Sequence, residues 1–127
     1  MTMPNERMRA LRWGRELLDQ IAQDLALPEP LRERARSLHP EYPGPSTLVQ
    51  WLAKGDSGLP VAWGEALTAS ARLFNEVRLG GQGCAETRKQ LLFTQRHFPE
   101  PNDIEPWTAA NGKLNLTEWL LPENYYQ

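Results

Sequence analysis

The sequence predicts an all-α protein, a compact helical bundle of two tandem, diverged helical hairpins related by a pseudo-twofold axis. Apolar residues recur at helical spacing in several segments, and prolines and glycines separate these segments. No segment shows the alternation of polar and apolar residues that is typical of a β-strand. Because the chain has 127 residues, of which 40% are hydrophobic and 24% charged, we expect a single domain over residues 1–127.

The first hairpin is expected to begin with the clearest helix of the chain, over residues 5–25. Its apolar side chains fall on one broad arc when they are placed at about 100° per residue. These apolar residues are Met8, Ala10, Leu11, Leu17, Leu18, Ile21, Ala22 and Leu25. A second helix is expected over about 29–39. A proline-rich turn over 40–45 then leads to a short helix over 47–53, for which Ser46 is a suitable N-cap.

A linker over residues 54–60 is expected to separate this hairpin from a second one with the same order of helices. The fourth helix is predicted over about 62–79 and ends at a run of glycines. The fifth is predicted over about 84–97, with Leu91 and Leu92 among its core residues, and stops before a proline. The C-terminal tail, residues 108–127, contains one further predicted helical turn.

An internal repeat supports the pairing of the two hairpins. Shifting the chain by 56 residues aligns 10–51 with 66–107 without a gap. The identical pairs are Ala10/Ala66, Leu11/Leu67, Leu17/Leu73, Arg32/Arg88, Pro43/Pro99, Pro45/Pro101 and Trp51/Trp107. We therefore predict internal repeats over about 5–53 and 62–107. Because the shared positions belong to helix cores and turns, we expect a duplicated scaffold, with function where the halves differ.

Composition limits the cellular settings of the chain. A net charge of −2 gives no general attraction for nucleic acid. The single cysteine, Cys84, excludes a disulfide within the chain and suits a reducing compartment. No apolar run approaches the roughly 20 residues that span a bilayer, and the first residues lack the apolar core of a signal peptide. We therefore expect a cytoplasmic protein that does not contact a membrane.

Part of the chain resembles a family of short uncharacterised bacterial proteins. The resemblance is clearest over about residues 1–43, in the opening MTMPNERMRAL, the RELL motif, Leu27-Pro28 and the segment 32–38. Those proteins share an MTMPxERTRA start and a leucine-rich helical hairpin that ends in His-Tyr-Pro. The segment from Arg96 to Pro99 is similar to that ending. The family has no assigned activity, so the resemblance implies a bacterial cytoplasmic protein and contributes no catalytic residues.

Residues capable of catalysis or metal binding are few and scattered. His39 and His97 occupy different offsets in the two halves, so we do not expect them to share a metal ion. Cys84 begins a predicted helix, but the nearest histidine lies far along that helix, so we expect the thiol to pack or cap. An enzyme is therefore the least favoured class, and neither a cofactor nor a metal is expected.

A DNA-binding transcriptional regulator is the main alternative. Residues 31–53 have the outline of a helix-turn-helix, and several arginines offer phosphate contacts. These arginines are Arg9, Arg12, Arg32 and Arg36. The predicted turn is longer and richer in proline than the usual one, and acidic residues lie between the arginines. Nucleic acid is therefore the less favoured partner.

The leading hypothesis is a small non-enzymatic protein-interaction or regulatory protein, encoded by a bacterium or one of its mobile elements. Aromatic side chains outside the shared core positions are the candidate contact residues, because they are common anchors at protein interfaces. They are Trp13, Trp119, Tyr125 and Tyr126. The expected partner is a protein, either a different chain or a second copy in a homodimer.

Overall fold

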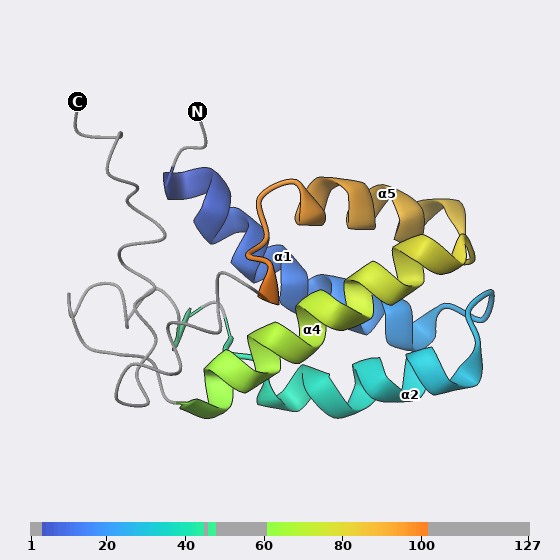
Figure 1. Cartoon of the computed structure of the whole chain (residues 1–127), viewed down its shortest axis with the longest axis horizontal. Coiled ribbons are helices and arrows are strands. Elements are labelled where there is room, and N and C mark those ends of the chain that lie inside the picture. The colour runs from blue at the N-terminus through green and yellow to red at the C-terminus, as the bar shows by residue number, and fades with distance from the viewer. Residues whose placement is uncertain (1–3, 45, 48–60, 102–127) are drawn as a thin grey trace.

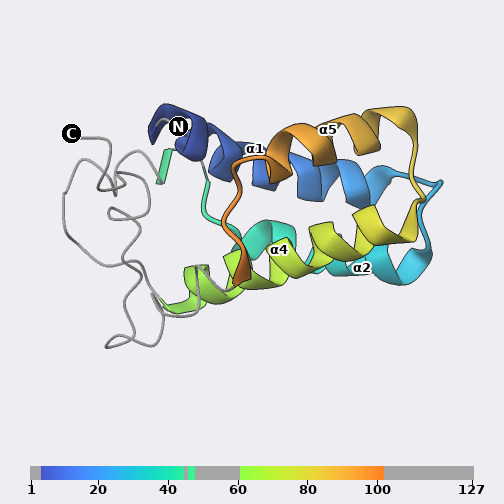
Figure 2. The same ribbon diagram turned by 45° about the horizontal axis from the view of Figure 1, so that its top comes forward.

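The computed structural model describes residues 4–44, 46–47 and 61–101. The helices within them are α1 (Pro4–Gln23), α2 (Glu29–Leu38), α4 (Val61–Gly80) and α5 (Ala85–Gln95), with a 3-10 turn, η1 (His39–Glu41), after α2. These ranges contain no strand, so the all-α prediction is confirmed. Helices α1 and α5 lie side by side, as do α2 and α4, which gives a bundle of two layers (Figures 1 and 2).

The helices lie close to their predicted bounds, with an informative difference at the end of α1. The sequence predicts a helix to Leu25, but α1 ends at Gln23. The Asp24 carboxylate accepts a hydrogen bond from the backbone N–H of Ala26 at 2.9 Å. Such a local bond competes with the helical hydrogen bonds and favours a turn. Leu25, predicted to be a core residue, is therefore 84% exposed.

The apolar arcs of α1 and α4 form the centre of the core. On α1, the residues of the predicted arc from Ala10 to Ala22 are buried, and so are their counterparts on α4 except Arg78, the counterpart of Ala22. The apolar side chains of α1 and α4 with no more than 2% exposure are Ala10, Leu11, Leu17, Leu18, Ile21, Ala66, Leu67, Leu73, Phe74 and Val77. Helical spacing alone therefore identified the buried faces of the two long helices.

The chain segments that follow α2 and α5 both return to Gly14, in the middle of α1. Tyr42 is buried, and its hydroxyl donates a hydrogen bond to the backbone carbonyl of Leu11. Phe98 is also buried and packs edge-to-face on Phe74, with ring centroids 5.3 Å apart and planes at 74°. A Cβ atom at Gly14 would lie 2.7 Å from Phe98 Cε2 and would also overlap the Tyr42 hydroxyl. The absence of a side chain at this residue lets both rings reach the helix backbone.

Several predicted features lie outside the described residues. They are the helix 47–53 apart from its first residue, the linker 54–60, and the tail 108–127 with its aromatic residues Trp119, Tyr125 and Tyr126. Each helix among the described residues is too short or too polar to span a bilayer.

We predict that Gly14→Ala lowers the free energy of unfolding by about 1–3 kcal/mol, because the added methyl group overpacks two buried rings. Urea denaturation followed by circular dichroism measures this change.

Gly80→Ala is the matched control, because a Cβ at Gly80 meets nothing within 4 Å. At this exposed helical position, alanine is expected to leave stability unchanged or raise it by up to about 1 kcal/mol. A Gly14→Ala protein as stable as the wild type would show that the Tyr42 and Phe98 rings do not depend on the glycine.

Candidate functional site

Trp13 borders a shallow groove between α1 and α5, on the outside of the bundle. The groove has a volume of about 150 Å³. It is lined by Trp13, Glu16, Glu86, Lys89, Gln90, Phe93 and Thr94. Trp13 is 38% exposed and Phe93 is 43% exposed, so two aromatic side chains remain partly in solvent at this groove.

Charged side chains surround the two aromatic residues. Arg9 lies one helical turn before Trp13 on α1, and its guanidinium carbon is 5.7 Å from the centroid of the Trp13 ring. This distance allows a cation–π interaction. Glu16 lines the groove from α1, and Lys89 lines it from α5. The groove therefore combines an apolar centre with charges of both signs.

The burial pattern of α5 explains why Phe93 is exposed. The buried residues of this helix are Thr87, Leu91 and Thr94, which share one face at helical spacing. Phe93 and Leu92 fall outside that face, and Leu92 is 64% exposed. The prediction that Leu92 is a core residue is wrong, because two threonines take the buried positions. The exposed Phe93 is not indicated by the sequence pattern.

Thr87 is buried because it binds a buried carboxylate. Asp24, which is 6% exposed, accepts hydrogen bonds at Oδ2 from the Thr87 hydroxyl at 2.6 Å and from the Cys84 backbone N–H at 2.9 Å. Its Oδ1 accepts from the backbone N–H of Ala26. The Gln20 amide donates to Thr87 Oγ1 at 3.1 Å. These bonds join the turn after α1 to the beginning of α5.

The hydrogen bonds to Asp24 determine its protonation. Burial acts to raise its pKa, but the bonds from Thr87 and from the backbone N–H groups of Cys84 and Ala26 outweigh that effect and lower the pKa below its ordinary value. A general base works best with a pKa near the operating pH. Asp24 has a lowered pKa, and both of its carboxylate oxygens already accept hydrogen bonds. We therefore interpret Asp24 as a structural residue that holds the two hairpins together. Both connecting turns lie at the same end of the bundle (Figure 1).

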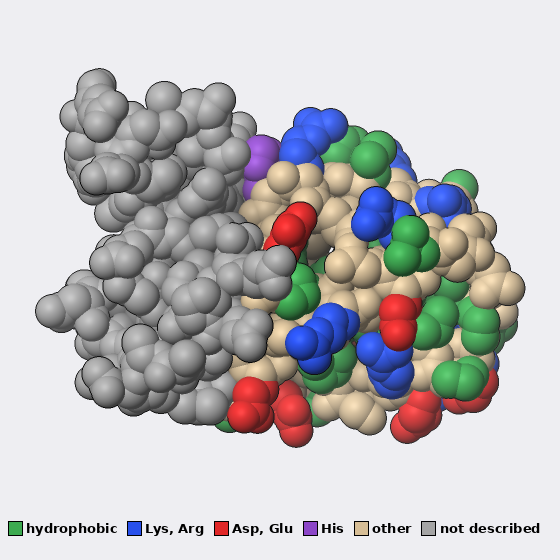
Figure 3. Space-filling model, viewed as in Figure 1, with side chains coloured by type: hydrophobic (Ala, Val, Ile, Leu, Met, Phe, Trp, Pro, Cys, Tyr) green, Lys and Arg blue, Asp and Glu red, His purple; other side chains and the backbone are tan. Residues whose placement is uncertain are grey.

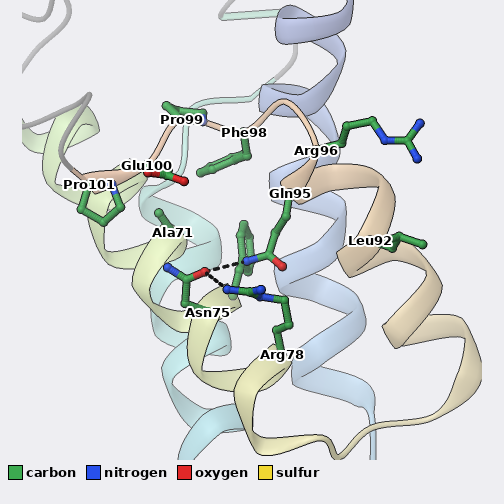
Figure 4. A pocket seen from close by; sticks show the side chains of 11 residues that line it. Ala71, Asn75, Arg78, Leu92, Gln95, Arg96, Phe98, Pro99, Glu100 and Pro101 are labelled. Carbon is green, nitrogen blue, oxygen red and sulfur yellow. Dashed lines mark hydrogen bonds between the residues drawn. The ribbon is translucent and has the colours of Figure 1, made fainter.

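A second hollow, which we call the α4–α5 cleft, opens between those two helices and has a volume of about 360 Å³ (Figure 4). It is lined by Ala71, Phe74, Asn75, Arg78, Leu92, Gln95, Arg96, Phe98, Pro99, Glu100 and Pro101. Arg78 Nη2 donates to Asn75 Oδ1 at 3.3 Å, and Gln95 Nε2 donates to the same oxygen at 3.0 Å. An amide network thus connects α4 to α5 across the cleft.

At the matching place of the first hairpin, an arginine side chain lies between the two helices. The 56-residue offset pairs Arg78 with Ala22 and Leu92 with Arg36. Arg36 Nη1 donates to the Ala22 carbonyl at 3.3 Å, so the arginine side chain covers the contact between α1 and α2. The second hairpin instead carries the arginine on its first helix, and α4 and α5 share a smaller contact than α1 and α2.

Two of the arginines of the DNA-binding alternative, Arg32 and Arg36, are paired with acidic side chains. Arg36 pairs with Glu33 at 2.6 Å and with Glu29 at 2.5 Å, and Arg32 also pairs with Glu29. Arg12 is exposed on α1. On the face drawn in Figure 3, acidic and basic side chains are mixed. The described residues contain no cluster of three or more histidine, cysteine, aspartate or glutamate side chains arranged to hold a metal ion.

No protein-family model matches the chain, and searches of the curated proteins and of the solved structures also find no match. The resemblance to short bacterial proteins therefore stays a prediction from the sequence.

We predict that Asp24→Asn lowers the free energy of unfolding at pH 7 by about 1–3 kcal/mol, because the buried donors lose a charged acceptor. The folded-state pKa is lowered, so the stabilising effect is present above the unfolded-state pKa of about 3.9 and is lost as the pH falls through the folded-state pKa. The stability difference between the two proteins should therefore shrink below about pH 4. Urea denaturation between pH 2 and pH 7 measures it.

Asp19→Asn is the control for this experiment. Asp19 lies on α1, the helix that ends just before Asp24; it is exposed and accepts a local hydrogen bond from Gln23 at 2.9 Å. Its substitution is expected to change stability by less than about 0.5 kcal/mol. Equal effects of the two substitutions would contradict the structural role of Asp24.

Proposed function

We propose that the chain is a non-enzymatic protein-interaction protein that associates with a second copy of itself through the groove between α1 and α5. The observation that carries this proposal is the partial exposure of Trp13 and Phe93 on adjacent helices, while Thr87 and Thr94 are buried. Partly exposed aromatic side chains are frequent anchors at interfaces, because each one removes a large apolar area from water on binding.

The charges at the groove favour a second copy of the chain as the partner over a protein whose contact surface is only acidic or only basic. Arg9 and Glu16 lie on α1, and Glu86 and Lys89 lie on α5, so bases and acids are equal in number around the aromatic centre. In a twofold dimer every contact occurs twice, because residue i of one copy meets residue j of the other and residue j of the first meets residue i of the second. A surface that carries both signs can then pair its acids with the bases of the other copy.

The size of the surface sets the expected strength of association. Helix α5 has 11 residues, so it is about 16 Å long, and two helices side by side are roughly 20 Å wide. The strip covers on the order of 300 Å² in projection, less than the roughly 800 Å² per partner of a standard interface. We therefore expect a weak, reversible dimer.

We further infer that the two hairpins are copies of one unit related by a pseudo-twofold axis. Helices α1 and α4 each have 20 residues. Buried side chains match at the 56-residue offset, as in Leu11 with Leu67 and Tyr42 with Phe98. The proposed interaction surface then lies at a place where the two copies differ, because the 56-residue offset aligns Trp13 with Ala69.

Sedimentation velocity tests the dimer with the double variant Trp13→Ala/Phe93→Ala. With concentrations from about 1 μM to 1 mM, the experiment detects even a weak dimer whose association free energy is only about −4 kcal/mol. The wild-type sedimentation coefficient is expected to rise over this range, whereas the double variant should stay monomeric because it lacks both apolar anchors.

The control is Leu25→Ala/Leu79→Ala, which removes two side chains that are 84% and 78% exposed and do not line the groove. This protein should associate like the wild type. The proposal is wrong if the wild type stays monomeric at 1 mM, or if the control loses association to the same extent.

A further inference from the structure

The α4–α5 cleft is a second candidate binding site, separate from the groove at Trp13. Its volume of about 360 Å³ lies in the range of small-ligand pockets, roughly 300–1,000 Å³. No residue lines both hollows. A ligand of the cleft and a partner at the groove can therefore be tested independently.

The floor of the cleft is apolar. The rings of Phe74 and Phe98 meet edge-to-face there, and Ala71 and Pro99 lie beside them. Leu92 borders the opening from α5 and remains 64% exposed. Phe74 itself is fully buried, so the apolar surface that a ligand can remove from water belongs to Leu92, to the partly exposed Pro101 and to the small exposed part of Phe98.

The amide network determines which polar groups face a ligand. A guanidinium only donates hydrogen bonds, so the Asn75 atom that Arg78 contacts must be the carbonyl oxygen. The Gln95 atom bound to that same oxygen must then be the amide nitrogen. Gln95 Oε1 is buried away from solvent and does not face the opening. The Asn75 side chain can therefore offer a ligand only the N–H groups of its amide.

Arg78 supplies the positive charge of the cleft, and its guanidinium points toward Asn75 in Figure 4. Within the described ranges, the ion pairs between arginine and carboxylate involve Arg32, Arg34 and Arg36, but neither Arg78 nor Arg96. Arg96 lies at the rim and points away from the floor (Figure 4). Glu100, also in the lining, has an interaction of its own.

We propose that the α4–α5 cleft binds a carboxylate carried on an apolar body, with Arg78 and the Asn75 N–H groups binding the carboxylate and the side chains of Phe98, Pro101 and Leu92 contacting the body. Arginine binds carboxylates through parallel N–H donors, and the lining around it is rich in donors. Arg96 adds positive charge at the rim. The first hairpin folds with Ala22 at the place of Arg78, so the hairpin architecture itself does not require this arginine.

The test is a titration of the full-length, ¹⁵N-labelled chain with N-acetylphenylalanine, followed by ¹H–¹⁵N correlation spectra. Its neutral amide, N-acetylphenylalanine amide, is the matched probe without the charge. We expect saturable shifts of the Asn75 side-chain NH₂ group and of the Phe98 and Arg78 backbone signals. The amide should bind at least about fivefold more weakly, because it lacks the charged acceptor.

Variants identify the residue that binds the carboxylate. Arg78→Gln should weaken binding of the acid about five- to twentyfold and leave binding of the amide nearly unchanged. Arg96→Gln should weaken binding of the acid less than Arg78→Gln does. Arg72→Gln is the control, because this exposed arginine lies on the same helix and does not line the cleft. It should bind both probes like the wild type.

A third probe, the capped peptide acetyl-Leu-Glu-amide, distinguishes a free acid from an acidic protein segment. Tighter binding of the peptide than of N-acetylphenylalanine indicates a segment, and the reverse order indicates a small acid. The proposal is overturned if no probe gives saturable shifts at 10 mM, if acid and amide bind equally, or if the shifts fall on Trp13 and Phe93. Because Arg78→Gln leaves the groove unchanged, this result does not depend on whether the chain forms a dimer.

Discussion

The Asp24 carboxylate determines which side of α5 faces the core. It holds the Thr87 hydroxyl and the Cys84 N–H, so the beginning of α5 cannot rotate without leaving buried polar groups unpaired. Burial of Thr87 brings Leu91 and Thr94 inward at helical spacing. The next positions along the helix then turn outward: Leu92 borders the cleft, and Phe93 borders the groove. Both hollows therefore depend on one polar contact between the hairpins.

The segments that follow α2 and α5 are fixed by the contact at Gly14, in the middle of α1. Tyr42 reaches α1 from the end of the first hairpin, and Phe98 reaches it from the end of the second. Burial raises the pKa of Tyr42 well above its ordinary value, so its hydroxyl stays protonated and keeps donating to the Leu11 carbonyl. Helix α5 is thus held by Asp24 before its first turn and by Phe98 after its last.

Much of the fold could be predicted because its determinants are local. The buried arc of α1 repeats within a few residues, and so does that of α4, so period alone identifies Leu11 and Leu67 as core. The face of α5 could not be found in this way. Of its two inward threonines, Thr87 donates a hydrogen bond to the Asp24 carboxylate, which is far away in the sequence, and the apolar pattern instead pointed to Leu92. Trp13 could be singled out from the sequence because its counterpart is alanine. Phe93 and Arg78 could not, because their roles depend on side chains from other helices that line the groove and the cleft.

Fixing α5 at both ends has a consequence for binding. When the side chains of a site are already ordered, binding of a partner costs little conformational entropy. Phe93 and Leu92 lie on one short helix, but they face different hollows because adjacent residues are about 100° apart around a helix axis. As long as Asp24 holds Thr87, occupation of the cleft leaves Phe93 in place, so we expect the two surfaces to bind independently. Coupling between them would require a rotation of α5, which the buried hydrogen bonds oppose.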